Sequence, residues 1–344
     1  MITLRLFNQQ LSMRFEQRAL LYSILLFGLL LIALLTSTLT GSYQLSLSDT
    51  LYTLFRQNQH VTDTQAFLII WEFRLPRSLA AALSGTLFAI SGALLQNMTR
   101  NPLADPSLVG ISHGAALAVV ILTILFPNYI DTWREVAAFL GAVCIAILIQ
   151  CLRGEESHPL KFILLGIGVA ALVSAIIATL LTYGNLQAAM SALLWLAGSV
   201  HVTSWPDITL LGGVLFIIGG LSLIQARTMS VISLGNDVAI GLGVSMKKQM
   251  IMQLSLSVGA AAIATAVVGP LGFVGLLAPH LARKIIKSGP ANHLLLTALV
   301  GATLVLTADI IGKSLFSPTQ LAAGLVTSLV GAPLFAYLLM KKPS

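Results

Sequence analysis

Charge-free apolar runs of about twenty residues recur along the whole of this chain, and each is long enough to cross a lipid bilayer as a helix. The 344 residues are 57% hydrophobic and only 9% charged, whereas soluble globular proteins carry about 25% charged residues. These few charges cannot cover a water-facing surface of this size. The sequence therefore excludes a soluble enzyme, a disordered chain and a fibrous repeat. It predicts an all-α, polytopic integral membrane protein that forms a single transmembrane domain over residues 1–344.

About ten transmembrane helices are predicted from these runs. Segment 249–282 contains no Asp, Glu, Lys or Arg and is too long for one helix. We divide it at Gly269-Pro270, because proline removes a helix hydrogen bond. The apolar piece 191–202 is too short to cross and is expected to lie against the bundle. The predicted spans are residues 19–39, 78–98, 107–126, 136–152, 162–183, 208–226, 249–268, 271–286, 294–311 and 321–340.

The basic residues divide unequally between the two sides that ten spans define. The side of the N-terminus holds most of the 19 Lys and Arg residues. Cytoplasmic loops carry an excess of these residues, so both termini are predicted to be cytoplasmic. This topology accounts for the net charge of +7. Nucleic-acid binding is not expected, since no Lys/Arg stripe with interleaved aromatic residues appears.

Sequence patterns for nucleotide, cofactor or metal binding are incomplete. Segment 312–314 (GKS) resembles the end of a phosphate-binding loop, but Thr307 stands where the pattern needs a glycine. No His, Cys and Glu cluster has metal-ligand spacing. Cys144 and Cys151 lie about 10 Å apart along a helix, which is beyond disulfide reach. We therefore expect a chain that is not an enzyme and binds no cofactor or metal.

Asp309 allows two interpretations, since it lies at the predicted end of a span. A buried acid within a membrane is a functional hypothesis, for example as part of a proton relay. The alternative, which we favour, is a polar residue at the outer interface that pairs with Lys313 four residues later. His280 and Arg283 close the short span 271–286, either as a gate or as ordinary cations at a helix C-terminus.

Four segments, in this order and spacing, resemble one family. They are RLPR at 74–77 with SGTLFAISGA at 84–93, RNPLADP at 100–106 with Gly110 and Gly114, GFVGLLAPHLAR at 272–283, and GAPLF at 331–335. The pattern resembles the FecCD-type (BtuC-like) permeases, the membrane subunits of bacterial importers for ferric siderophores, haem and vitamin B12. The resemblance marks as family structural residues Asn101, Pro102, Asp105, Pro106, Gly110, Pro279, His280 and Arg283.

The resemblance implies a larger assembly in the bacterial inner membrane. A second permease subunit, identical or paralogous, would complete a pathway, and two separate ATPase subunits would bind ATP and Mg. A periplasmic binding protein would deliver an iron–siderophore chelate, with haem or cobalamin as the alternative substrate. Two rival classes stay open at this point: an ion-coupled secondary transporter or channel that uses Asp309, and an intramembrane enzyme that uses His280 or Asp309.

The longest cytoplasmic loop, 228–246, is the candidate for ATPase coupling. Without the resemblance it is a polar loop; with it, the loop is similar to the family's short coupling helices. Gly235 and Gly243 would end or turn such helices. The residues predicted to couple are Leu234, Gly235, Asn236, Asp237, Ala239, Leu242 and Gly243.

Three basic residues fall on the outer face, against the topology signal: Arg74, Arg77 and Lys313. The resemblance implies that they receive acidic residues of the binding protein; snorkelling at the membrane interface is the alternative. The sequence departs from the family pattern in two places. Gln320 begins the segment where Glu-x-Pro-x-Gly is usual, and Lys313 replaces an arginine, which keeps the charge but loses bidentate recognition.

Overall fold

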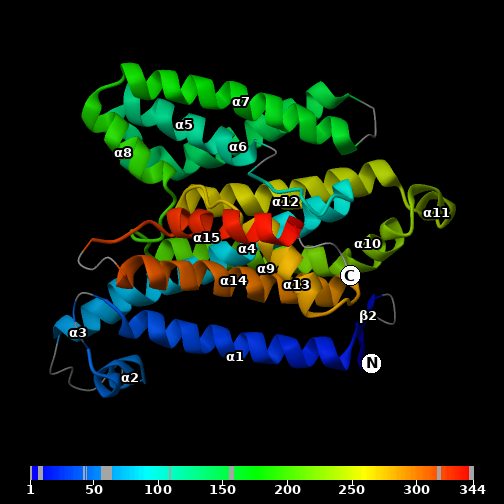
Figure 1. Cartoon of the computed structure of the whole chain (residues 1–344), viewed down its shortest axis with the longest axis horizontal. Helices are drawn as coiled ribbons and strands as arrows, with labels where there is room; N and C mark the ends of the chain where they lie inside the picture. The colour runs from blue at the N-terminus through cyan, green and yellow to red at the C-terminus, as the bar shows by residue number, and fades with distance from the viewer. Residues whose placement is uncertain are drawn as a thin grey trace.

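Apolar helices account for most of the described chain, which comprises residues 2–6, 11–41, 43, 45–55, 64–107, 110–154, 159–315 and 319–340 of a computed structural model. Among these residues, seven helices are long and apolar enough to cross a membrane, and they run roughly along one axis (Figure 1). They are α1 (Gln17–Leu39), α4 (Leu75–Thr99), α6 (Ile130–Arg153), α7 (Pro159–Tyr183), α9 (Trp205–Ile224), α12 (Met246–Val268) and α14 (Pro290–Ser314).

Four shorter helices complete the bundle: α5 (Ile111–Leu125), α8 (Leu186–Leu196), α13 (Val274–Ile285) and α15 (Ala323–Met340). Each of the ten predicted spans coincides with one helix, and the predicted partial helix overlaps α8. Helix α13 has only 12 residues, because Gly269-Pro270 ends α12 and the chain resumes its helix at Val274. The expected all-α membrane fold is therefore confirmed.

Small elements gather at the two ends of the bundle (Figure 1). One end carries α10 (Ala226–Ser233), α11 (Asn236–Gly241) and the antiparallel strands β1 (Ile2–Leu6) and β2 (Leu11–Phe15). The opposite end carries α2 (Leu47–Phe55), α3 (Thr64–Leu68), the π-helix η1 (Ile69–Arg74) and the 3-10 turn η2 (Pro127–Tyr129). We call the first the inner end and the second the outer end.

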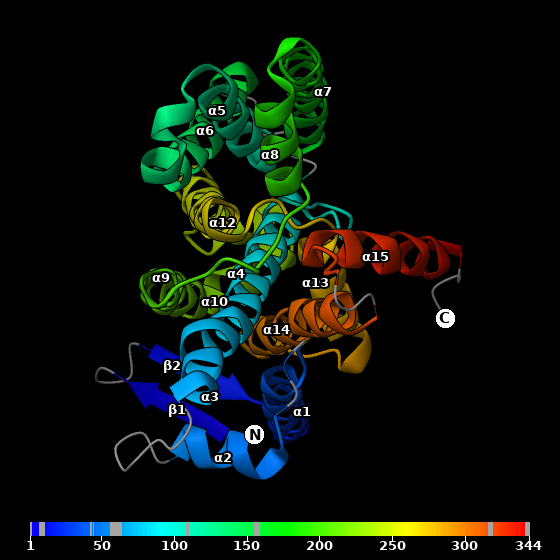
Figure 2. The ribbon, with the colours of Figure 1, turned by 90° about the vertical axis from the view of Figure 1, so that its left-hand side faces the viewer.

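Helix α4 is the central helix of the bundle (Figure 2). It approaches its neighbours through glycines: a Cβ at Gly85 would collide with the carbonyl oxygen of Gly301 in α14, and a Cβ at Gly92 with that of Gly275 in α13. Small residues permit such close helix packing in membranes. Most of α4 is consequently buried, including Arg77 in its first turn, and Arg74 just before the helix is buried as well.

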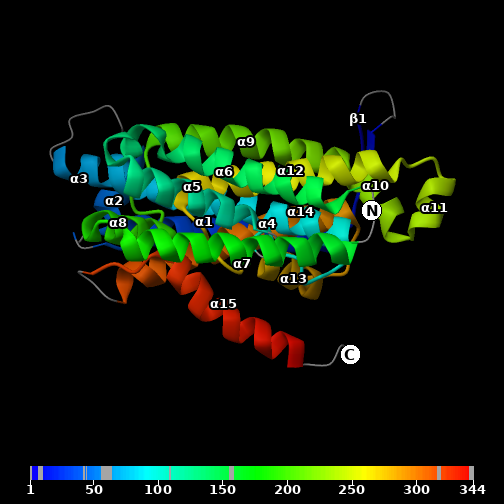
Figure 3. The same ribbon diagram turned by 90° about the horizontal axis from the view of Figure 1, so that it is seen from above.

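Two parts of the bundle stand apart from this centre. Helices α5, α6, α7 and α8 form a group that packs beside α12 (Figure 2). Within it, Gly114 of α5 and Gly141 of α6 face one another so closely that a Cβ on either would collide with the other's carbonyl oxygen. Helix α15 leaves the bundle at an angle (Figure 3), with Leu329 75% exposed.

Candidate functional site

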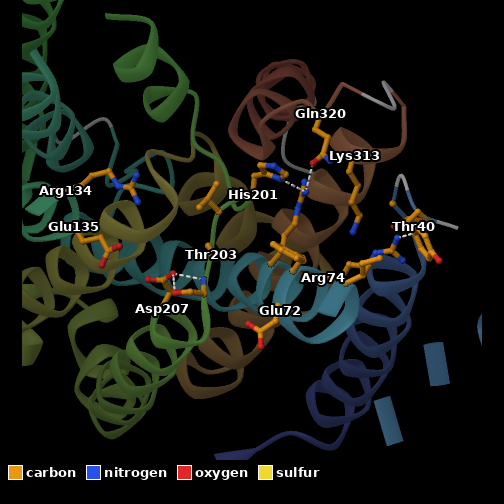
Figure 4. Close-up of a pocket in the computed structure, with 17 residues that line it drawn as sticks. Thr40, Glu72, Arg74, Arg134, Glu135, His201, Thr203, Asp207, Lys313 and Gln320 are labelled. Atoms are coloured by element: carbon orange, nitrogen blue, oxygen red, sulfur yellow. Dashed lines mark hydrogen bonds between the residues drawn. The ribbon is translucent and has the colours of Figure 1, made fainter. Parts of the chain in front are cut away.

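A charged cavity of about 710 Å³ opens at the outer end. Figure 4 shows Arg134, Glu135 and Asp207 on one side of it, and Arg74, Lys313 and Gln320 on the other. Helices α6 and α9 supply the first group, and η1, α14 and the segment before α15 supply the second. The loop between α8 and α9 crosses between the two sides with His201.

Arg77 is held by an ion pair inside the wall of this cavity. Its Nη2 lies 2.8 Å from Oδ1 of Asp309, and its Nε donates to both carboxylate oxygens, at 3.0 and 3.1 Å. The remaining Nη1 donates to Oε1 of Gln320 at 2.5 Å and lies 2.9 Å from Nδ1 of His201. Asp309 is only 1% exposed, so this charge pair is shielded from water.

Arg74 and Lys313 hold the C-terminal end of α1. Arg74 Nη1 donates to the carbonyl oxygens of Thr38 and Leu39 at 2.8 and 3.2 Å. Lys313 Nζ donates to the carbonyl and hydroxyl oxygens of Ser37 at 2.6 and 2.8 Å. The last carbonyls of a helix lack intrahelical partners and carry partial negative charge. These two cations therefore terminate a helix to which they do not belong.

The three predicted docking residues thus lie together at the outer end and line the cavity, but each is buried, at 8%, 8% and 7% exposure for Arg74, Arg77 and Lys313. Snorkelling does not describe them, because their charged groups point to protein partners. The expected pairing of Asp309 with Lys313 is present, at 3.9 Å. Asp309 is also buried, and its closer partner is Arg77.

His201 is the titratable group at the centre of the cavity wall. It belongs to the loop between α8 and α9, outside the spans. Burial lowers the pKa of His201 below its ordinary value, and the neighbouring Arg77 lowers it further, against a weaker opposite effect of Asp309. The neutral imidazole can accept a hydrogen bond from the guanidinium. No sequence pattern around His201 predicted that it would lie in the wall of a charged cavity.

The candidate coupling segment at the inner end consists of two short helices, α10 and α11, as expected. Gly235 separates them with φ +125°, and Gly243 follows α11 with φ +82°. Leu234 and Leu242 are 67% and 64% exposed, whereas Ala239 is fully buried. Asp237 is exposed in the first turn of α11; Asn236 begins that helix, and its side chain lies outside the described part.

Helix α10 is attached to the bundle by direct contacts with its neighbours. Arg100, which follows α4 in a left-handed conformation, donates from Nη2 to the carbonyl oxygen of Ile232 at 2.8 Å. Met229 and Ile232 of α10 are buried. The segment is therefore fixed at its base and presents apolar side chains beyond it.

The segment after α4 folds around its acid. Asn101 Oδ1 accepts a hydrogen bond from the Leu103 amide at 2.9 Å, and Oδ1 of the buried Asp105 accepts one from the Ser107 amide at 2.7 Å. Burial is the main cause that raises the pKa of Asp105. Gly110 ends the segment and precedes α5 with φ +85°.

This segment packs against the start of α13. A Cβ at Gly275 would lie 3.1 Å from Oδ2 of Asp105 and 2.8 Å from Cδ of Pro106. The carboxylate thus lies at the N-terminus of α13, where negative charge is favourable. Pro102 precedes the acid in a turn.

The other end of α13 is tied to α4. Arg283 Nη2 donates to Oε1 of Gln96, and Pro279 lies inside α13 on its buried side. His280 is half-buried, and its Nε2 has no hydrogen-bond partner among the described residues. The family residues of these two segments thus join α4, α5 and α13.

Comparison with known proteins relates this architecture to one protein family. Residues 29–341 match the model of the FecCD transport family. The chain belongs to this family. Its relatives include the achromobactin transport system permease CbrC of Dickeya dadantii, 40% identical over 80% of both chains. The hemin transport system permease HmuU of Yersinia pestis is 34% identical over 92% of this chain and 96% of that protein.

A solved structure has the same fold. It is an inward-facing conformation of a metal-chelate type ABC transporter, with a TM-score of 0.82, 28% identity, and coverage of 93% of this chain and 98% of the other. Together these similarities identify the FecCD chain as a permease subunit of an ABC importer.

Proposed function

We propose that this permease carries an iron–siderophore chelate across the bacterial inner membrane. Two separate ATPase subunits, which bind ATP and Mg, would drive it, and a periplasmic binding protein would supply the chelate. The observation that carries the ATPase contact is the contrast between a fixed base and exposed leucines in α10 and α11. Exposed apolar side chains gathered on one short segment beyond the spans support a protein interaction site there. The choice of chelate is supported by the similarity to the achromobactin permease.

Coupling is assigned to Leu234, Gly235, Asn236, Asp237, Ala239, Leu242 and Gly243. The two glycines turn the chain, the buried Ala239 holds α11 against its surroundings, and Leu234 and Leu242 are presented to a partner. A push on α11 would pass directly to α12, which begins at Met246. Such rigid-body motion is a common way to switch access.

The binding protein is assigned to the outer end, over the cavity lined by Arg74, Arg77 and Lys313. Because these cations are already paired inside the chain, an acidic partner would add to existing networks instead of neutralising free charges. The direct docking role of the three residues stays a prediction. Long-range attraction would be weak and contact geometry would decide the affinity.

The second permease subunit is assigned to the side from which α15 projects. Among the described residues, the main contacts of α15 are with α13 and α14, and Leu325, Leu329 and Val330 are all more than half exposed. A second copy or a paralogue packed here would cover these side chains and leave a pathway between the subunits. The inner end would then be cytoplasmic, with both termini on that side.

The decisive experiment is reconstitution with and without an active ATPase. The permease should copurify with an ATPase subunit, and uptake of radioactive iron as a ferric siderophore should stop when that ATPase is inactivated. Uptake driven by an ion gradient without the ATPase would contradict the proposal. Competition by unlabelled siderophore, hemin and cobalamin identifies the substrate, since hemin competition alone would favour the activity of the hemin transport relative.

A further inference from the structure

Helix α12 carries a buried polar stripe that neither proposed partner site uses. It consists of Gln249, Gln253 and Ser257, spaced four residues apart and therefore on one face of the helix. Gln253 and Ser257 are at most 1% exposed. Both amide atoms of Gln253 and Oε1 of Gln249 have no hydrogen-bond partner among the described residues.

At Ser257, the polar groups of the stripe are hydrogen-bonded to helix α4. Ser91 Oγ of α4 donates to the carbonyl oxygen of Ser257 at 2.7 Å, and Ser257 Oγ donates to that of Ser91 at 2.9 Å. This reciprocal pair joins α4 and α12 directly. One helical turn closer to the inner end, Gln253 has no equivalent arrangement.

Polar side chains of α6 lie at the level of Gln253. Arg153 Nη1 lies 3.0 Å from Sδ of Met250, which brings the inner end of α6 beside the start of α12. Gln150 lies three residues from Arg153 in α6, and Gln253 lies three residues from Met250 in α12, both away from the inner end. Each step is about 4.5 Å along the helix axis, so Gln150 and Gln253 lie at the same level. Oε1 of Gln150 is also buried without a partner in the described chain.

Helix α9 reaches the same level from another side. A Cβ at Gly259 of α12 would lie 3.4 Å from Cδ1 of Ile218. Helices α9 and α12 are joined through α10 and α11 and run antiparallel. Seven residues from this contact towards the inner end, α9 reaches Gln225 and α12 reaches Met252, so these two residues lie at the same level. Gln225 is 4% exposed and Ser222 1%, and within the described residues neither side chain has a hydrogen-bond partner.

We infer that water molecules occupy a polar seam between α12 and helices α4, α6 and α9, from the inner end up to the Ser91–Ser257 pair. Neutral amides and hydroxyls on three sides provide the two to four polar partners that a buried water needs. Buried amides without any partner would be strongly unfavourable. The partly exposed Gln249 lies towards the inner end, and the buried Gln253 lies one turn deeper, so water would enter from that end.

A hydrated seam has a mechanical consequence at this position. Water-mediated hydrogen bonds can replace direct ones at little cost, so α12 can shift against its neighbours without loss of side-chain pairs. The seam begins directly after α11, where a coupling push would arrive. This consequence rests on the proposed coupling role; the hydration of the seam does not.

Thiol accessibility in membranes tests the hydration. In a Cys144→Ala, Cys151→Ala background, single cysteines replace Gln249, Gln253 and Ala261, and a small charged thiosulfonate reagent is added at the inner face. Ala261 is fully buried on α12 beyond the serine pair. Gln253→Cys should react at least about ten-fold faster than Ala261→Cys, since thiolates form in water and not in apolar surroundings.

Equally slow reaction of Gln253→Cys and Ala261→Cys, with Gln249→Cys reactive, would overturn the inference and show a dry seam in which the amides bond one another. If Gln253→Cys does not accumulate in the membrane, Ser222→Cys is the conservative replacement that gives the same test from α9. Its reaction should match the expected rate of Gln253→Cys; a rate as slow as that of Ala261→Cys overturns the inference equally.

Discussion

The outer and inner ends of this permease use their distinctive residues in opposite ways. At the outer end, Arg74, Arg77 and Lys313 are turned inward and bound to carbonyls or to Asp309. At the inner end, Leu234 and Leu242 are turned outward and largely exposed. The three cations at the outer end are thus buried, whereas the two leucines at the inner end are exposed.

The difference shows that residue type alone does not tell which end of a membrane protein meets a partner. Cations at the membrane surface suggest docking, yet here they terminate α1 and join α4 to α14. Exposed leucines suggest lipid contact, yet these belong to a short helical segment beyond the spans. The outer end should therefore respond to mutation through stability, and the inner end through transport.

The largest expected effect is at the buried ion pair. Arg77→Ala or Asp309→Asn leaves an uncompensated buried group and should cost about 3–5 kcal/mol of stability, with loss of protein from the membrane. Arg77→Glu should do the same, since it places two acids side by side. Thermal unfolding in detergent measures the loss.

The double variant Arg77→Met with Asp309→Leu is the matched control. It removes both charges and should be less destabilised than either single change. If Arg77→Ala instead unfolds like the wild type and loses only affinity for the binding protein, the outer end is a docking surface in the direct sense and the comparison fails.

A large effect on transport without a loss of protein is expected at Gly243. Its φ of +82° is unfavourable for a β-branched residue, and Gly243→Val should introduce strain of about 1–3 kcal/mol in the turn after α11. Uptake and substrate-stimulated ATP hydrolysis should both fall, while membrane abundance stays unchanged.

Gly241→Val controls for bulk, because a Cβ at Gly241 would also meet open space, but this glycine lies in α11 with ordinary helical backbone. It should retain clearly more uptake than Gly243→Val. Equal uptake by both variants, at the wild-type level, would show that the turn does not couple ATP hydrolysis to transport.

A smaller effect is expected at the end of α1. Lys313→Met removes a cation from a helix C-terminus and should reduce stability by up to about 2 kcal/mol, whereas Lys313→Arg should keep most of it. Unfolding midpoints provide the measurement. Lys287→Met, at an exposed position of the inner end, should leave the midpoint unchanged; an equal shift in both variants would mean that the loss is not specific to α1.

The smallest effect concerns pH. Because the pKa of His201 is lowered in the folded chain, the unfolded chain binds more protons once the pH falls below the ordinary histidine pKa of about 6.5. Stability should therefore decrease on acidification through that range. His201→Gln should remove this part of the pH dependence; an identical pH profile in both proteins would show that His201 does not contribute.

Much of the fold is predictable because the membrane imposes a length. Apolar runs placed all ten spans within a few residues of helices, and Gly235 and Gly243 correctly indicated turns around α11. The strands β1 and β2 were missed, since no apolar run of sufficient length marks them. The prediction of a single transmembrane domain over residues 1–344 rests on the same apolar runs.

The outer site could not be predicted in the same way. Arg77 and Asp309 are 232 residues apart, and no local spacing connects them. Lys313 lies one turn from Asp309, so local spacing indicates that contact but not the closer one with Arg77. Gln320 was visible as a departure from the family pattern, but its hydrogen bond to Arg77 depends on how the segment before α15 folds back.

The C-terminal end of α1 is bound by cations that are synthesised after it, so α1 gains its contacts in a fixed order during synthesis. Ser37 and Lys313 are 276 residues apart, and at about 5–20 residues per second the ribosome needs tens of seconds to make the intervening chain. During that time the first helix is in the bilayer while its last carbonyls await Lys313. Arg74 emerges much earlier and can secure α1 provisionally. A nascent chain truncated before α14 should therefore retain a first helix that is more easily extracted or degraded than that of the full-length permease.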